Sequence, residues 1–360
     1  MAIWLSVMLI APALAQEDTA ESLPTAHWVD LARLTHAWET FNNCGPATLT
    51  MALGYYGYPD DAPDAQQIAA AYLKPNRNDG SVSFWQMVDY VNEVTGPDYG
   101  LQAVFRRGGS LDLLRRLLAN DFPVVLGKGL ELSGPGMGWF GHYVLAVGYD
   151  DDAQMLYTYD SQKGYGDSSG LPQEYAYIQR TWQQFNNVFL VIYDVEREAE
   201  LQALMGTLWD EQSAWESALI AAEANLAANP DDLWAVFNVA EINSYLGNYA
   251  VATAAYDVAL FERRGLPFRT LWYMQGAFRA YYATGQFRRV LDLTGRVQAE
   301  TPHIEDMNYY RGLVHAARGE AEAARERFLL VLDFNPNFYP AAEALAALEA
   351  GTFVGPVEAP

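Results

Sequence analysis

The second half of the chain repeats, and this repeat restricts the architecture it can adopt. Beyond Glu196 the sequence is rich in alanine, with apolar residues at helical spacing and glycines where one helix would end and the next begin. Gly285 and Gly319 stand 34 residues apart, and Ser213 and Gly247 share this spacing. Because a unit of this length accommodates two helices and a turn, we expect stacked helical hairpins.

One of these units resembles a known repeat. The best match consists of Leu246-Gly247-Asn248-Tyr249, Ala252, Tyr256 and Ala259. It is similar to the tetratricopeptide repeat, with a four-residue insertion near Arg263-Arg264-Gly265-Leu266. The resemblance implies an all-α superhelix over residues 197–350, whose concave groove would bind a peptide or protein partner. Three prolines are expected to end the second helix of their units: Pro230, Pro302 and Pro336.

The first half contains the only cysteine, in the stretch Phe41-Asn42-Asn43-Cys44-Gly45-Pro46-Ala47. Residues 48–56 are apolar on nearly every side, which predicts a helix buried inside a domain. Asn43 is a favourable N-cap residue and Pro46 fits the first turn, so we expect Cys44 at the helix start. The positive end of the helix dipole and a neighbouring imidazole would both favour the nucleophilic thiolate.

Other segments of this half predict helices first and strands afterwards. Helical spacing occurs in residues 64–73, 83–94 and 110–119. Runs rich in β-branched and aromatic residues occupy 122–126, 142–147, 155–159 and 187–193. Between the second and third of these, Asp150-Asp151-Asp152 predicts a hairpin turn, with a calcium site as a less favoured alternative. Helices followed by an antiparallel sheet indicate an α+β fold.

A candidate catalytic set follows from this arrangement. His142 begins one predicted strand and Asp160 ends its hairpin partner, so an imidazole and a carboxyl would lie side by side. If the buried helix packs on the sheet, Cys44 reaches the imidazole, and the three groups suit nucleophilic acyl transfer. Alternatively, Cys44 is a small buried apolar residue and Asp160 caps a strand end. Three further residues are candidates for secondary site roles, although roles in the core and turns are favoured for them: Trp182, Asn186 and Asn187.

The same motifs resemble those of the papain-like cysteine peptidases of family thirty-nine, the bacteriocin-processing enzymes that cut double-glycine leaders and their secreted relatives. The resemblance rests on Asn43-Cys44-Gly45-Pro46-Ala47, Gly141-His142-Tyr143-Val144, Gly148-Tyr149-Asp150 and Tyr159-Asp160-Ser161. It implies a papain-like domain over residues 36–195, with Cys44 as nucleophile, His142 as general base and acid, and Asp160 orienting His142. A peptide or protein would be the substrate.

One residue departs from the family pattern. The family usually has a Gln shortly before the nucleophile, whose amide donates to the oxyanion, but this chain has Glu39 there. An ionised carboxylate would repel the developing charge, whereas a protonated one could donate a hydrogen bond and would shift activity towards acid pH. Trp38 or the Cys44 backbone N–H is an alternative donor.

Composition and the termini limit the remaining possibilities. Residues 1–15 are expected to be a signal peptide, with an apolar stretch and an Ala13-Leu14-Ala15 end, followed by a flexible lead-in over 16–35. We therefore expect an exported protein without an integral membrane segment once mature. The formal net charge of −23, with three lysines, disfavours nucleic acid as a partner. No cofactor or metal motif is expected, and residues 351–360 should form a loose tail.

Three functions remain open from the sequence. The first is an exported cysteine peptidase that uses Cys44, His142 and Asp160, with a repeat domain that binds the substrate or a partner. The second is a catalytically inactive peptidase-like scaffold that acts as a protein-binding module, which Glu39 favours. The third keeps the thiol chemistry but transfers the acyl group to an amine, as a thiol acyltransferase does.

Overall fold

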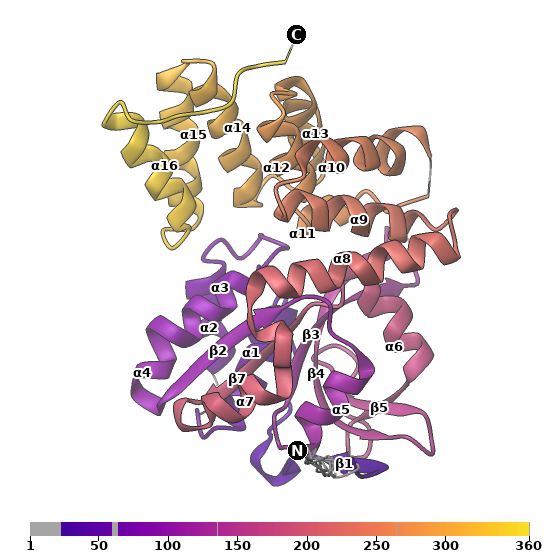
Figure 1. The fold of residues 1–360 in the computed structure, drawn as a ribbon. Helices are drawn as coiled ribbons and strands as arrows, with labels where there is room; N and C mark the ends of the chain where they lie inside the picture. Colours follow the sequence, from indigo (N-terminus) through magenta and orange to yellow (C-terminus); the bar gives the residue numbers. More distant parts are fainter. Residues whose placement is uncertain (1–22, 60–63, 135, 264, 360) are drawn as a thin grey trace, which may run out of the picture.

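The computed structural model describes residues 23–59, 64–134, 136–263 and 265–359. A sheet domain built from residues 23–194 lies below a helical half, residues 211–349, in Figure 1. The expected signal peptide, residues 1–15, lies outside the described residues. No helix in the described residues combines the length and apolar character needed to cross a membrane.

An antiparallel sheet forms the centre of the first half. Its strands follow the order β2-β7-β3-β4-β5-β6, and β1 also pairs with β4. The four predicted β runs are confirmed, and the hairpin turn lies between β4 and β5 as expected. The bounds are β1 (Ala26–Trp28), β2 (Leu101–Arg106), β3 (Val124–Leu132), β4 (Gly138–Asp150), β5 (Met155–Tyr159), β6 (Leu171–Glu174) and β7 (Phe189–Asp194).

The prediction of a flexible lead-in over residues 16–35 is wrong for residues 26–33, which form a strand and a 3₁₀ turn. Ala26–Trp28 form β1, in register with Asp150 to Gly148 of β4, and a 3₁₀ turn, η1, follows at Leu31–Arg33. Val29 is buried, and Trp28 donates a hydrogen bond from Nε1 to the Ser169 carbonyl. These apolar residues give the segment enough contact with the sheet to order it.

Helices cover both faces of the sheet, and the predicted helices are confirmed. Ser110 caps α5 by accepting from Leu113 N, and Ser83 with Gln86 forms a capping box at α3. The π-helical turn η2 continues α3. The bounds are α1 (Cys44–Gly54), α2 (Ala65–Leu73), α3 (Phe84–Asp89), η2 (Tyr90–Thr95), α4 (Gly96–Tyr99), α5 (Leu111–Ala119), α6 (Tyr175–Trp182), η3 (Gln183–Phe185), η4 (Val195–Arg197), α7 (Glu198–Met205) and η5 (Gly206–Trp209).

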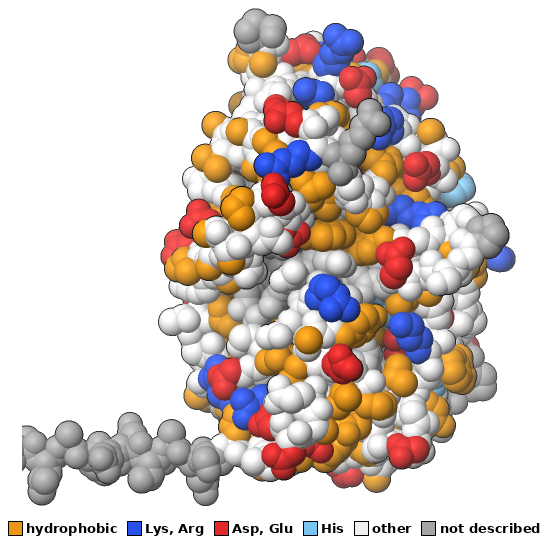
Figure 2. Space-filling view, turned by 90° about the vertical axis from the view of Figure 1, so that its right-hand side faces the viewer, with side chains coloured by type: hydrophobic (Ala, Val, Ile, Leu, Met, Phe, Trp, Pro, Cys, Tyr) orange, Lys and Arg blue, Asp and Glu red, His pale blue; other side chains and the backbone are white. Residues whose placement is uncertain are grey.

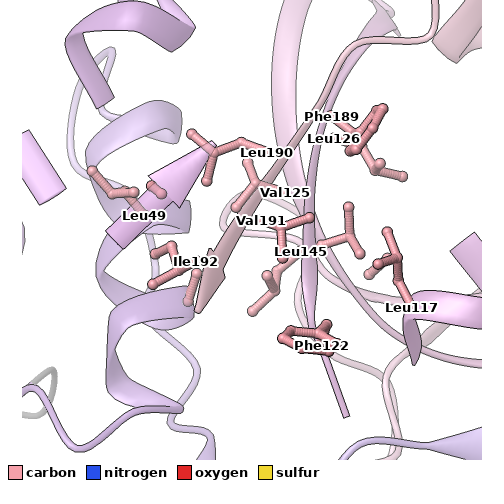
Figure 3. Close-up of a cluster of buried hydrophobic side chains, with 14 of the residues drawn as sticks. Leu49, Leu117, Phe122, Val125, Leu126, Leu145, Phe189, Leu190, Val191 and Ile192 are labelled. Carbon is pink, nitrogen blue, oxygen red and sulfur yellow. The ribbon is translucent and has the colours of Figure 1, made fainter. Parts of the chain in front are cut away.

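The core of the sheet domain fills both sides of the central strands. In Figure 3, Leu49 of α1 and Leu117 of α5 lie on opposite sides of the strands that carry Val125 and Leu190. Residues of β7 from Phe189 to Ile192 are all buried, which explains its continuous apolar run. Because α1 is packed into this core, its first residue is held in a fixed position relative to the sheet.

The second half consists of paired helices, as its sequence predicts. Gly247, Gly285 and Gly319 have φ of 81°, 71° and 74°, a conformation that glycine adopts easily where a helix ends. Each predicted proline stop lies just beyond a helix end. The bounds are α8 (Glu211–Ala228), α9 (Leu233–Tyr245), α10 (Tyr249–Asp257), its π-helical continuation η6 (Val258–Glu262), α11 (Thr270–Tyr273), α12 (Gly276–Ala283), α13 (Phe287–Glu300), α14 (Glu305–Ala317), α15 (Ala321–Phe334) and α16 (Tyr339–Glu349).

The tail, predicted to be loose, instead packs on the helical half. It runs back from α16 across α14 in Figure 1, and Ala359 N donates to the Gly285 carbonyl at 2.8 Å. Arg318 donates from Nε and Nη2 to the two carboxylate oxygens of Glu358. Phe353 packs against the cluster around Phe328 and Phe338. An apolar anchor and a bidentate ion pair hold this segment in place.

The two halves touch at several places, and asparagine side chains make some of these contacts. On one side, Asn335 and Asn337 donate from their amides to the carbonyls of Leu73 and Tyr72. On the other side, Asn238 donates to the Gln183 carbonyl at 2.6 Å. The residues between these contacts face each other across an open space. On the face shown in Figure 2, acidic and basic side chains are interspersed with apolar ones.

Candidate active site

Cys44 is the first residue of α1 and is half-buried. Asn43 occupies the N-cap position as predicted, but its side chain caps nothing and instead donates to Thr40 Oγ1 at 2.9 Å. A Cβ on Gly45 would lie 2.9 Å from Met87 Cε, so the helix start packs more closely than a larger residue would permit. This close packing fixes the thiol at the edge of the core.

His142 and Asp160 meet across the β4–β5 hairpin. His142 Nε2 lies 2.9 Å from Asp160 Oδ1, and both side chains are buried. The backbone N–H groups of Gln162 and Lys163 donate to the same oxygen, at 2.9 and 3.0 Å. Asp160 therefore has a fixed orientation and holds the imidazole in one plane.

The charges of this pair stabilise each other. Burial disfavours the charged form of both groups. For Asp160 this is outweighed by the hydrogen bond and charge of His142 and by the backbone donors, which lower its pKa to about 2. For His142, hydrogen bonds and charges from Asp160 and Cys44 outweigh burial and raise its pKa to about 10. At neutral pH the site holds an imidazolium next to a carboxylate.

Cys44 and Glu39 complete the cluster. A sulfur from Cys44, a carboxylate oxygen from Glu39 and a ring nitrogen from His142 all lie within 4.8 Å of one another. Because Nε2 of His142 is engaged by Asp160, Nδ1 is the nitrogen left for the thiol. The structure thus brings together the four residues that the sequence singled out. An imidazolium next to a cysteine favours its thiolate form.

The loop before the helix fixes Glu39. Ser161 follows Asp160, and its hydroxyl donates to Glu39 Oε2 at 2.6 Å. The backbone carbonyl of Ser161 accepts from Glu39 N at 3.0 Å. Gln66 on α2 holds the flanking residues, accepting from Thr40 N and donating to the Trp38 carbonyl. The Trp38 side chain is 61% exposed, and its ring packs edge-on against His36.

The first half of the chain is similar to a known protein family. Residues 12–190 match the Peptidase_C39 like family. No curated protein matches the chain. The match includes Cys44, His142 and Asp160, and it begins before residue 36, where the sequence predicted the domain to start. It therefore includes β1, which the structure joins to the sheet. The α+β arrangement of this C39-like domain fits a papain-like cysteine peptidase.

Two lysines that sequence reasoning overlooked support the site of the C39-like domain. Lys74 is buried, and its Nζ donates to the carbonyls of Asn42 and Asp79 at 2.7 and 2.6 Å, which anchors the loop before Cys44. Lys128 on β3 pairs in register with His142 and is fully buried. Burial lowers its pKa to about 8, although the charge of Asp160 opposes this. A lysine within the apolar run of β3 was the signal available in the sequence.

The residues assigned to core and turns have those roles. Trp182 is buried and donates from Nε1 to the Val188 carbonyl at 2.6 Å. Asn186 and Asn187 have φ of 53° and 51°, the left-handed conformation that asparagine tolerates.

Among the described residues, one cluster has a geometry that could hold a metal ion: Glu39, Cys44 and His142. A metal ion there would coordinate the sulfur and block its attack on a substrate.

A cavity of about 720 Å³ connects the C39-like domain to the helical half. It reaches His142 and Gly141 on β4, and its opposite wall is formed by α9, α12, α14 and α16. The volume lies within the range of ligand pockets, roughly 300–1,000 Å³. Aromatic side chains line both walls, among them Phe84, Phe105, Phe185, Tyr249, Tyr282 and Tyr309. A ligand in this cavity would lie next to His142, one of the catalytic candidates.

Proposed function

We propose that the protein is an exported cysteine peptidase that hydrolyses peptide bonds with Cys44, His142 and Asp160. The observation that carries this proposal is the buried hydrogen bond from His142 to Asp160, with Cys44 and its thiol next to the same ring. The match to the Peptidase_C39 like family supports the same chemistry. Export rests on the sequence of residues 1–15 alone.

The reaction follows from the positions of these groups. The Cys44 thiolate attacks the carbonyl carbon of the scissile bond, forming a C–S bond and an oxyanion. The C–N bond breaks as the His142 imidazolium gives its proton to the leaving amine. Water then attacks the thioester while His142 accepts a proton from it, which releases the acid and restores the thiolate. Asp160 keeps the imidazole oriented throughout.

The helical half has the role of a tetratricopeptide-repeat domain in this proposal. Its 34-residue spacing, its paired helices and the glycines at its helix ends support this assignment. Residues of α9, α12, α14 and α16 line the cavity opposite the C39-like domain, which supports a part for the repeats in binding the substrate.

Alkylation by iodoacetamide tests the proposal directly. The folded protein should react rapidly at pH 6, because a cysteine activated by a neighbouring imidazolium reacts faster than a free thiol, and His142→Ala should abolish this rapid reaction. Slow labelling with the pH profile of a free thiol in both proteins would exclude an activated nucleophile.

A binding-only function is the second candidate, because Glu39 replaces the usual oxyanion donor. The Ser161 hydroxyl donates to Glu39 Oε2, so this carboxylate oxygen accepts a hydrogen bond where the usual amide would donate one. Rapid labelling of Cys44 without turnover of any peptide in a mixed peptide library would favour this candidate. Product analysis in the presence of an added amine would reveal acyl transfer instead of hydrolysis.

A further inference from the structure

Two arginines from different halves of the chain meet in the cavity on one aromatic ring. Arg107 follows β2 and Arg279 lies on α12, and their guanidinium carbons are 5.3 and 5.4 Å from the centroid of the Tyr245 ring. Arg107 also lies 4.4 Å from the centroid of the Trp215 ring. Stacking of this kind orients the planar guanidinium and leaves its N–H edges available for a ligand.

Within the described residues, neither guanidinium forms an ion pair, whereas Arg115 and Arg318 elsewhere do. Two acids also line the cavity. Glu241 already accepts from Tyr256 and from the Gly276 N–H. Burial raises the pKa of Glu241, although Tyr256 and the more distant charges of both arginines oppose this.

The second acid, Asp306, does not neutralise the arginines either. Burial, followed by the charge of Glu305, raises the pKa of Asp306 to about 8, so its carboxyl is protonated at neutral pH. The cavity therefore contains two guanidinium groups that form no ion pair with a described carboxylate, in a chain whose formal net charge is −23. Positive groups without partners at a half-buried site are favourable places for an anionic group of a ligand.

A carboxylate fits this site better than other polar groups. Its two oxygens match the fork of a guanidinium, and hydrogen bonds between the two charged groups are stronger than neutral ones. The aromatic walls, including Phe84 and Tyr309, would accept an apolar side chain next to the carboxylate. Because the cavity reaches His142, a peptide bound there would extend to the candidate active site.

We propose that this cavity binds peptide segments that carry a carboxylate next to an apolar side chain, with Arg107 and Arg279 holding the carboxylate. The choice of a peptide as ligand rests on the proposed peptidase function, whereas the choice of a carboxylate rests on the two arginines. The carboxylate belongs either to an Asp or Glu side chain or to a peptide C-terminus. The chain's overall negative charge would by itself attract basic peptides. Tighter binding of a basic peptide would therefore contradict the proposal.

Fluorescence anisotropy with the full-length Cys44→Ala variant tests the proposal without cleavage. The probes are dansyl-Phe-Ala-Glu-Ala-amide, its Gln and Lys analogues, and the Gln peptide with a free C-terminus. We expect at least one carboxylate peptide to bind about tenfold more tightly than the Gln amide. Tight binding of the Glu amide identifies a side-chain carboxylate, and tight binding of the free-acid peptide identifies a C-terminus.

Matched variants then locate the binding site. Arg107→Gln and Arg279→Gln, each added to Cys44→Ala, should remove this preference and leave affinity for the Gln amide unchanged. Arg288→Gln is the control, since its side chain is 94% exposed on α13. Arg107→Lys retains the charge in case the Gln variant fails to fold, and it should bind the carboxylate peptide with intermediate affinity.

The outcomes separate this proposal from the peptidase function. Equal affinity for all peptides, tightest binding of the Lys peptide, or a carboxylate preference that survives both Arg→Gln changes would overturn the carboxylate site. The peptidase function would still stand if iodoacetamide labels wild-type Cys44 rapidly at pH 6. Conversely, arginine-dependent carboxylate binding together with an unreactive Cys44 would retain the site and reject the peptidase.

Discussion

His142 Nε2 lies 2.9 Å from Asp160 Oδ1 with both side chains buried, and two backbone N–H groups hold the same oxygen. Loss of this carboxylate should leave the imidazole without its orienting partner. We expect Asp160→Ala to lower kcat/KM by roughly 10²–10⁴-fold, the usual contribution of general acid–base catalysis. Asp160→Asn retains an acceptor and should lose less. Asp167→Ala, an exposed aspartate in the same loop, is the control, and equal activity in the two alanine variants would contradict the assigned role.

The ion pair should make stability depend on pH in a defined window. The pKa of His142 is raised from 6.5 to about 10, so its contribution is complete below pH 6.5 and is lost as the pH rises through 10. The pKa of Asp160 is lowered from 3.8 to about 2, so its contribution is present above pH 3.8 and is lost as the pH falls through 2. Urea unfolding should therefore show wild type more stable than His142→Ala by a constant margin from pH 3.8 to 6.5, narrowing outside that range. A difference in unfolding free energy between the two proteins that stays constant below pH 3.8 and above pH 6.5 would rule out the ion pair.

Glu39→Gln should raise turnover near neutral pH. The amide would retain an oxygen to accept from Ser161 and would add an N–H₂ donor for the oxyanion. We expect a gain of at least about tenfold, since one oxyanion donor commonly contributes 10²–10³-fold. Initial rates of wild type and variant across pH measure the effect. Ser161→Ala in each background shows whether the hydroxyl positions this side chain, and an unchanged pH optimum in Glu39→Gln would remove the carboxyl from the mechanism.

Gly141→Ala should loosen the contact between the two halves. A Cβ there would lie 2.9 Å from Phe185 Cζ and 3.0 Å from Tyr273 Cγ, next to His142. Overpacking of this kind commonly costs about 1–3 kcal/mol in the free energy of unfolding. Gly295→Ala on α13 is the control, because its Cβ would meet Arg311 Nη1 at 3.7 Å. Urea unfolding compares the two variants, and equal stabilities would show that the junction tolerates the methyl group.

The hairpin that carries His142 and Asp160 was predictable because its signals are local. The run of β-branched and aromatic residues predicted β5 with its observed bounds, Met155–Tyr159, and the three aspartates predicted the turn. β6 was missed because it is short and contains Pro172, which ordinarily argues against a strand. The ordered tail was missed because Glu358 depends on Arg318, a distant residue.

The arrangement of the site was only partly accessible from sequence. Motif order suggested that Cys44, His142, Asp160 and Glu39 act together, and the structure brings them together, although their catalytic roles stay predictions. Arg107 gave no such signal, because its neighbour Tyr245 belongs to the other half of the chain. No local sequence pattern predicts a cavity whose walls come from segments far apart in the sequence.

The cavity next to His142 has one wall from the sheet domain and the other from α9, α12, α14 and α16. The reactive groups and half of the recognition surface are thus encoded in separate stretches of sequence. If the proposed function holds, substitutions at the cavity-lining positions of α12 or α14 would change substrate binding while leaving the hairpin and Cys44 in place. Related proteins could then differ in the peptides that they bind while keeping the same catalytic residues. A protein engineer could change selectivity by replacing these helices alone.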